Sequence, residues 1–520
     1  MTPRAQLAED RAEQQRWRAS VRAACAALDA HLYPDSLTVS DGLAFALVRR
    51  GLEKYLLVLY QNESRAAAFA GTHTASAVHH TRSGVKLCPL THQNAAAIRG
   101  HLPFTAPVAL SQGRSIGTGD RLGLATPGHV RALRRGSMKP VLAQQSVREM
   151  TRTQRSVNDV LDDVTWGVLQ AGYREGFAAD ADHLKTTSDI EHALEAGFTM
   201  YTIDPSDYVD GSADDAAPSD LAARLAALPW DALCSTPDDC RRAYANRTFT
   251  VQGDRDAFRL RITPEEVLRA AVKYGRAIGR IAATYRHLAS RWPRERYTFE
   301  VSVDESDAPT STVEHFYIAS ELRRLGVRWD GLAPRFVGHF YKGVDYVGDP
   351  ARFRTEFAKH VLVAQHFGSY KISLHSGSDK FAIYPIVAEL AGDLIHVKTA
   401  GTSYVEALRL VAHAAPALFR EILRFVKQRY RADKATYHVS ADVRRVAEPD
   451  DVRDADLPAL LDQWDTRQVC HVTYGSVLTT RAADGRFLFR DDFFALLKRN
   501  EEPHYRLLEE HFLRHLHPFR

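Results

Sequence analysis

Residues 370–399 read YKISLHSGSDKFAIYPIVAELAGDLIHVKT, and their pattern is that of a strand, a helix and a second strand. The stretch opens with a short, partly apolar run, Tyr370–His375, and ends with a β-branched run, Leu394–Thr399. The segment between them has the apolar spacing of a helix. Two buried strands joined by one helix are typical of a parallel sheet with crossover helices.

The same alternation extends upstream to about residue 104. Counting both runs quoted above, eight strand-like runs are separated by segments with helical spacing. The predicted strands are Phe104–Leu110, Pro140–Gln145, Phe177–Asp182, Phe198–Asp204, Tyr297–Asp304, Pro334–His339, Tyr370–His375 and Leu394–Thr399. Eight consecutive β/α units are the number that closes a TIM barrel, so we expect an α/β protein with a (β/α)8 barrel over residues 104–413.

One connection in this barrel is unusually long. Residues 205–262 are rich in Asp, Ala and Pro, and we expect an inserted subdomain or an active-site cover there. The following segment, Thr263-Pro264-Glu265-Glu266, has the N-cap, proline and glutamate of a capping box, which predicts a helix to about Ser290.

The two flanks of the barrel differ in character. Residues 1–103 predict a small α/β region with an opening helix and strands near Leu43–Val48 and Tyr55–Tyr60. Residues 414–520 predict a mostly helical flank packed on the barrel.

Composition excludes several classes of protein. The 520 residues are 45% hydrophobic and 25% charged, as in globular proteins, and the net charge of +4 does not predict a nucleic-acid partner. No signal peptide and no run of 18 apolar residues are found, so we expect a cytoplasmic protein without a membrane partner. The five scattered cysteines form no CxxC pair and predict neither disulfides nor a zinc ribbon. The oligomeric state stays open.

Polar side chains fall at the ends of most of the predicted strands, where a TIM barrel places its active site. They are Gln144, Gln145, Asp182, His183, Asp204, the segment Glu300–Glu305, His339, His375 and Lys398. Any one of them could be a helix cap or a turn residue. Capping explains aspartates, but it does not explain three histidines and a lysine at the same edge, so we expect a functional site.

The histidines predict a metal centre. His183 and His375 offer imidazole nitrogens that suit a divalent ion such as Zn, Mn, Ni, Co or Fe, and His339 could complete the set. His396 competes as third ligand, although strand alternation places it deeper, on the same face as Lys398.

Carboxylates complete the predicted chemistry. Glu300 and Glu305 are also competent metal ligands. Asp182, next to His183, and Glu300 on the fifth predicted strand form a pair that could move a proton in opposite directions.

An oxygen-rich anion is the expected substrate class. The turn from His375 to Lys380 has small residues and exposed amides that could hold a carboxylate or phosphate, although a simple capped glycine turn explains it equally well. The Gly-rich run Ser115–Gly123 departs from nucleotide-binding patterns, so no nicotinamide cofactor is predicted. The expected substrate-binding residues are Arg121, Gln145, Lys371, Ser376, Asp379 and Lys398, and Arg148 is a further candidate.

Seven stretches resemble one known family, the bacterial tagaturonate epimerases, which use a divalent metal to interconvert D-tagaturonate and D-fructuronate. The stretches are GTGDRLGLATPGHVRAL (117–133), AQQSVREMTRT (143–153), ADADHLK (179–185), FTMYTIDPSD (198–207), FEVSVDE (299–305), ISLHSGSDKF (372–381) and HVKTAGTSY (396–404). The resemblance implies that Asp182 and Glu300 are the acid/base pair and that His183 and His375 bind the metal. It does not place a third ligand, and residues 208–260 are expanded relative to the family.

The implied reaction constrains the mechanism. Inversion at C4 of a 2-keto sugar acid is not simple enolisation, because C4 is β to the carbonyl group. We therefore expect a retro-aldol opening of the C3–C4 bond followed by re-addition. A metal-dependent sugar-acid aldolase and a non-catalytic sugar-acid sensor are the alternative functions.

Overall fold

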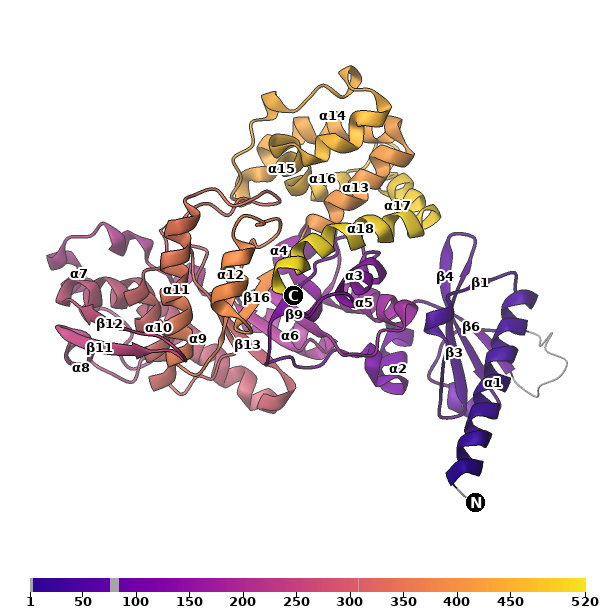
Figure 1. Cartoon of the computed structure of the whole chain (residues 1–520), viewed down its shortest axis with the longest axis horizontal. Helices are drawn as coiled ribbons and strands as arrows, with labels where there is room; N and C mark the ends of the chain where they lie inside the picture. Colours follow the sequence, from indigo (N-terminus) through magenta and orange to yellow (C-terminus); the bar gives the residue numbers. More distant parts are fainter. Residues whose placement is uncertain (1–2, 75–83, 307) are drawn as a thin grey trace.

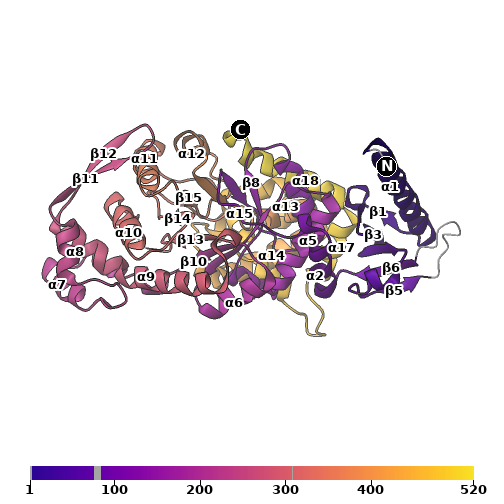
Figure 2. The same ribbon diagram turned by 90° about the horizontal axis from the view of Figure 1, so that it is seen from below.

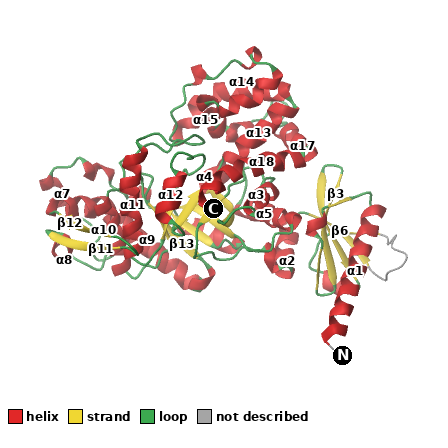
Figure 3. Cartoon of the chain, viewed as in Figure 1, coloured by secondary structure: helices red, strands yellow, loops and turns green. Residues whose placement is uncertain are grey.

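A closed barrel of parallel strands forms the centre of the protein, whose computed structural model describes residues 3–74, 84–306 and 308–520. Each barrel strand pairs with the next one along the chain, and the last strand closes onto the first. The eight strands are β7 (Ser115–Gly117), β8 (Lys139–Ser146), β9 (Ala178–Leu184), β10 (Met200–Ile203), β13 (Thr298–Ser302), β14 (Gly331–Ala333), β15 (Lys371–Leu374) and β16 (Ile395–Lys398). The predicted TIM barrel is confirmed; its strands are yellow in Figure 3.

Two of the predicted strands were misplaced. The first strand of the barrel is β7, within the glycine-rich run, and not Phe104–Leu110. The latter segment contains Pro107, which cannot donate to a strand ladder, and its Leu110 packs against Val141 and Ala178. The sixth strand, β14, ends at Ala333 before the predicted Pro334–His339 begins.

Helices connect the strands and cover the outside of the barrel. They are α3 (Thr126–Leu133), α4 (Val147–Thr153), α5 (Val157–Ala171), α6 (Thr187–Ala196), α9 (Pro264–Arg291), α10 (Thr312–Arg324), α11 (Pro350–His366), α12 (Tyr384–Ala391) and α13 (Thr402–Ala414). Helix α9 begins with the predicted capping box, in which the Thr263 hydroxyl accepts the Glu266 amide. The apolar faces of α3 to α12 named here and the outer faces of the strands form the largest hydrophobic core, whereas the apolar face of α13 packs in a second core with the C-terminal helices.

The long connection after β10 is a small subdomain. It contains α7 (Pro218–Ala226), α8 (Pro237–Tyr244) and a hairpin of β11 (Arg247–Gln252) and β12 (Ala257–Ile262). Figure 1 and Figure 2 place it at one end of the molecule, with the N-terminal region at the other end and the barrel between them. It contributes no side chain to the cavity described below, so among the described residues it is not an active-site cover.

The N-terminal α/β region is confirmed. Helix α1 (Pro3–Ala27) packs on one face of a six-stranded sheet whose described strand pairs are all antiparallel. The strands are β1 (His31–Leu32), β2 (Thr38–Ser40), β3 (Leu43–Arg50), β4 (Glu53–Tyr60), β5 (Thr72–Thr74) and β6 (Gly84–Pro89). The other face packs on α2 (His92–His101) and on Trp166 and Leu169 of α5, which joins this region to the barrel.

The C-terminal region is helical, as predicted, and lies over the barrel in Figure 1. Its helices are α14 (Pro416–Asp433), α15 (Trp464–Val472), α16 (Tyr474–Thr479), α17 (Arg490–Arg499) and α18 (Glu501–Leu516). Helix α18 packs closely on α3, where a Cβ at Gly128 would lie 2.8 Å from Leu508. In the described part of the chain, no helix has the length and apolar character to cross a membrane.

Candidate active site

One cavity lies at the C-terminal ends of the barrel strands, where the sequence predicted the site. The ends of β8, β9, β15 and β16, the loops after β13 and β14, and the C-terminal helical region all border it. Its polar lining includes Arg121, Gln144, Arg148, Asp182, His183, Asp304, Glu305, Lys342, His375, Ser376, Lys398, Tyr437 and His471.

A bulge in β9 brings two adjacent functional residues to the same side of the strand. Tyr201 of β10 pairs with Ala181, but Ile203 already pairs with Leu184, so β9 contains one extra residue. His183 adopts the left-handed backbone conformation, with φ 58°. In a regular strand Asp182 and His183 would point to opposite faces. The bulge turns both toward the cavity, where Asp182 Oδ1 lies 2.9 Å from His183 Nδ1.

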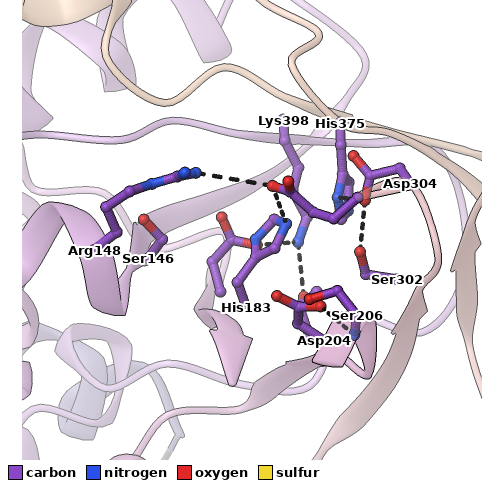
Figure 4. Close-up of polar contacts among 12 residues, drawn as sticks. Ser146, Arg148, His183, Asp204, Ser206, Ser302, Asp304, His375 and Lys398 are labelled. Carbon is purple, nitrogen blue, oxygen red and sulfur yellow. Dashed lines mark hydrogen bonds and ion pairs between the residues drawn. The ribbon is translucent and has the colours of Figure 1, made fainter. Parts of the chain in front are cut away.

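His183, His375 and Asp304 form a cluster at the base of the cavity. Their nearest ligand-type atoms all lie within 4.8 Å of one another, and the two imidazole centres are 5.0 Å apart. Figure 4 shows these three side chains gathered beside Lys398. Asp304 Oδ1 lies 3.0 Å from His375 Nδ1 and also accepts the Ser302 hydroxyl. Two imidazole nitrogens and a carboxylate are a donor set that first-row divalent ions favour.

Each histidine of this cluster has a carboxylate on its other ring nitrogen. Asp182 contacts His183 Nδ1, and Glu300 Oε1 lies 2.8 Å from His375 Nε2. Such pairs fix the ring orientation of metal-binding histidines. His183 Nε2, which faces the cluster, is buried and has no hydrogen-bond partner among the described residues. The arrangement therefore fits a divalent cation held by His183, His375 and Asp304.

The electrostatics of the cluster favour a positive charge. Although burial opposes the charged ring, Asp304 and Glu300 raise the pKa of His375 to about 10. Burial raises the pKa of Asp304, but His375 and His183 outweigh it and hold that pKa below its ordinary value. A cation bound here would take the place of the protons that these contacts now stabilise.

Lys398, at the end of β16, neutralises a group of buried carboxylates. Its ammonium nitrogen lies 2.8 Å from Asp180, 2.7 Å from Asp182 and 2.8 Å from Glu300, and it donates to Thr202. Burial alone would raise the pKa values of Asp182 and Glu300, but Lys398 and the histidines hold both well below their ordinary values. For Asp180, burial and the neighbouring carboxylates prevail and raise the pKa to about 7. A Cβ at Gly331 would lie 2.9 Å from Glu300 Oε2, so the glycine leaves room for this carboxylate.

Three of the predicted site residues, besides Asp379, lie outside the cavity. His339 is not part of the cluster of His183, His375 and Asp304: its backbone pairs with that of Val347, and its ring stacks on Tyr341. The error follows from the misplaced sixth strand, which ends six residues earlier. Lys371 begins β15 and therefore lies at the opposite end of the barrel, where it donates to Leu110 and Ser115. Gln145 points outward by strand alternation and donates to Glu149.

Asp379 connects two parts of the chain and does not border the cavity. Its carboxylate lies 3.1 Å from Arg467 and 3.3 Å from His511, and its amide donates to His515 Nε2. These contacts tie the turn after β15 to the C-terminal helices. His515 accepts that amide through Nε2, and its Nδ1 contacts the His511 carbonyl, so its ring offers no nitrogen to a metal. Ser376, in the same turn as Asp379, does border the cavity, as predicted.

Arg121 borders the cavity, but its guanidinium group is occupied. It donates to Glu149 and to the His471 carbonyl and stacks over Tyr474 at 3.6 Å. His396, the competing third ligand, lies deeper and contacts Ser115 through Nδ1 at 2.9 Å. Burial lowers the pKa of His396 to about 3, as expected for a neutral core histidine.

Comparison with known proteins identifies the family of the chain. Residues 33–519 match the model of a protein family described as tagaturonate epimerase.

The chain belongs to the tagaturonate epimerase family.

Named relatives of the family agree in sequence and in structure. The tagaturonate/fructuronate epimerase of Thermotoga maritima is 41% identical over 486 residues, which are 93% of this chain and 96% of that protein. Crystal structures of the fructuronate-tagaturonate epimerase of Cohnella laeviribosi, one native and one with one glycerol, are each 37% identical. Both cover 96% of this chain and 99% of theirs, with TM-scores of 0.88 for the native structure and 0.89 for the glycerol complex.

Several cavity residues of this tagaturonate epimerase family member were missed from the sequence. Asp304 lies two residues beyond the end of β13, inside the segment Glu300–Glu305, in which the sequence predicted a role only for Glu300 and Glu305. Lys342 and His471 come from a loop and from the C-terminal flank, where strand-end position gives no signal.

Proposed function

We propose that this protein interconverts D-tagaturonate and D-fructuronate with the help of a divalent metal ion. The observation that most supports the proposal is the convergence of His183, His375 and Asp304 in one cavity, in a chain whose family is named for this epimerisation. The two carboxylate–histidine pairs and the unpartnered His183 Nε2 support the metal. The expected cytoplasmic location stays a prediction.

The ion in this proposal is bound by His183, His375 and Asp304, and Zn, Mn, Ni, Co and Fe all suit such a donor set. When bound, the ion would act as a Lewis acid on the keto and hydroxyl oxygens of the sugar acid. Asp182 and Glu300 would hold the two imidazole rings in the orientation that binding requires.

Proton transfer is assigned to Asp182, because it borders the cavity whereas Glu300 does not. Lys398 and His183 keep Asp182 ionised at neutral pH, as a proton acceptor must be. In the retro-aldol route Asp182 takes the proton from the C4 hydroxyl, and the C3–C4 bond opens to give an aldehyde at C4 and an enediolate at C2 and C3. The aldehyde rotates, the C3–C4 bond re-forms on its other face, and Asp182 returns the proton to the C4 oxygen. Glu300 contributes indirectly, through its contacts with His375 and Lys398.

The route predicts where hydrogen is retained. When the reaction runs in ²H₂O, the fructuronate formed from tagaturonate should contain no deuterium at C4, because the C4–H bond never breaks. Mass spectrometry and NMR of the product measure this directly. Deuterium at C4 that accumulates as fast as product would exclude the retro-aldol route and leave the epimerase proposal to be explained by deprotonation at C4.

Metal dependence is tested by removal and restoration. Dialysis against a chelator should abolish the conversion of tagaturonate to fructuronate, and adding back one of the divalent ions should restore it. Circular dichroism before and after dialysis controls for unfolding. Full activity in protein shown by elemental analysis to contain no transition metal would contradict a metal at His183, His375 and Asp304.

A further inference from the structure

We propose that Arg148 and Lys342 form the subsite that binds the carboxylate of the sugar acid, and that they select acids over neutral ketoses of the same configuration. The proposal rests on the proposed function, because that function supplies the anionic substrate. Both residues border the cavity that contains the metal-type cluster. They come from different parts of the fold, Arg148 from α4 and Lys342 from the loop after β14.

The first step of the argument is position. Glu305 Oε1 lies 3.8 Å from His183 Nε2 and 3.9 Å from Arg148 Nη2. A single carboxylate oxygen of Glu305 thus lies within 4 Å of both His183 and the Arg148 guanidinium group. Figure 4 shows Arg148 extended toward the group that contains His183, His375 and Lys398. A six-carbon sugar acid whose reacting carbons lie at the cluster can therefore reach Arg148 with its far end.

The second step is unused binding capacity. Arg148 donates through Nη1 to the Thr436 carbonyl, but its Nε is buried without a partner among the described residues. Across the same described ranges, the Lys342 ammonium makes no hydrogen bond or ion pair with a protein group. Arg121, in contrast, is fully engaged by Glu149 and His471. The only ion pair that Arg148 makes among the described residues is the long 3.9 Å contact with Glu305. A guanidinium group with a free N–H and an ammonium group without a direct partner are the groups that bind a carboxylate ligand.

The third step is electrostatic cost. Burial, followed by the charge of Arg148, lowers the pKa of Lys342. Two cations facing one cavity repel each other and lose hydration, and a carboxylate bound between them would offset both effects. The Tyr437 ring, 4.7 Å from the Arg148 guanidinium, supports that side chain from one side.

A buried histidine provides independent evidence of a ligand in this part of the cavity. His471 is 1% exposed and borders the cavity, and neither ring nitrogen has a partner within the described residues. Burial, aided by Arg121 and Lys342, holds the pKa of His471 well below its ordinary value, so the ring is neutral. A buried neutral imidazole with two open positions is expected to hydrogen-bond a sugar hydroxyl or carboxylate oxygen.

Binding affinity for an acid and its neutral counterpart tests this assignment. Isothermal calorimetry on the full chain, with the same divalent ion in every sample, would compare tagaturonate with tagatose, which has a hydroxymethyl group in place of the carboxylate. We expect wild-type protein to bind the acid roughly 10- to 100-fold more tightly. Arg148→Met and Lys342→Met should each lose most of that preference while binding tagatose within about 3-fold of wild type. Arg148→Lys should recover part of it.

Arg152 provides a matched control. It also lies 4.7 Å from the Tyr437 ring and donates to Thr436, yet it does not border the cavity. Arg152→Met should therefore keep the preference for the acid. Equal loss of acid and neutral binding, an unchanged preference in the Arg148 and Lys342 variants, or a matching loss in Arg152→Met would each overturn the assignment. Binding is measured separately from turnover, so a protein that binds the acid without interconverting it would contradict the proposed function and leave this subsite supported.

Discussion

The His375→Ala variant should convert tagaturonate to fructuronate at least about 100-fold more slowly than wild type and should retain less divalent metal after dialysis. His375 contributes one nitrogen to the cluster with Asp304 and His183, and its other nitrogen lies 2.8 Å from Glu300. Alanine removes the ligand and also leaves two carboxylates without the ring that they contact. Loss of an outer partner of a metal ligand already costs about 10- to 100-fold, so loss of the ligand should exceed this.

The matched control is the histidine that the sequence wrongly placed in the metal site. His339 stacks on Tyr341 away from the cluster, so His339→Ala should keep its metal content and its turnover within about 3-fold of wild type. Turnover and elemental analysis on both variants measure the contrast. A His375→Ala protein with wild-type metal content, or a His339→Ala protein without metal, would contradict the ligand assignment.

The second large effect is on stability. Lys398→Met should lower the free energy of unfolding by about 3–5 kcal/mol, because it leaves Asp180, Asp182 and Glu300 buried without their shared cation. The Lys398 side chain is 3% exposed, so water cannot replace its ammonium group without rearrangement. The same substitution should abolish turnover, because Lys398 borders the cavity and holds Asp182 in place. Urea unfolding monitored by circular dichroism gives the stability difference.

A control at Lys273 separates the loss of stability from the loss of turnover. This lysine is equally buried and lies 2.8 Å from Asp214 and 2.9 Å from Glu314, but it belongs to α9, outside the cavity. Lys273→Met should lose a comparable free energy of unfolding and retain turnover at a temperature where both variants are folded. If Lys398→Met unfolds like wild type, the three carboxylates do not depend on it, and the electrostatic description of the site is wrong.

The fold was predictable because its signal is repeated. Eight apolar runs separated by helical spacing specify a barrel even when two runs are misplaced. The two errors have a common cause, since β7 and β14 are only three residues long and contain glycine, so longer neighbouring apolar segments resembled strands more closely. The capping box at Thr263 is a purely local signal, and it predicted the start of α9 correctly.

The site was only partly predictable, for reasons of geometry. Strand-end position found Asp182, His183, His375 and Lys398, which all border the cavity. It could not show that a bulge turns His183 inward, because register shifts depend on pairing across strands. Strand-end position also did not tell which lysine lies at the cavity. Lys398 ends β16 at the cavity, whereas Lys371 begins β15 at the opposite end of the barrel.

Strand-end position could not predict the site residues that lie outside strands. The direction of Asp304 depends on the path of a loop, and Lys342 and His471 reach the cavity only through tertiary packing. The two predicted acid/base carboxylates lie on β9 and β13, but only Asp182 borders the cavity, whereas Glu300 contacts His375, and we therefore propose different roles for them. Burial and neighbouring charge, which set those roles, are properties of the folded chain.

The most direct test is the product composition when purified wild-type protein, supplied with a divalent ion, is incubated with tagaturonate until no further change occurs. We predict a mixture of tagaturonate and fructuronate only, and the same mixture when the reaction starts from fructuronate. Accumulation of free three-carbon fragments would identify an aldolase that shares the retro-aldol step but releases its products. Unchanged tagaturonate, in the presence of every candidate ion, would contradict the proposed epimerase function.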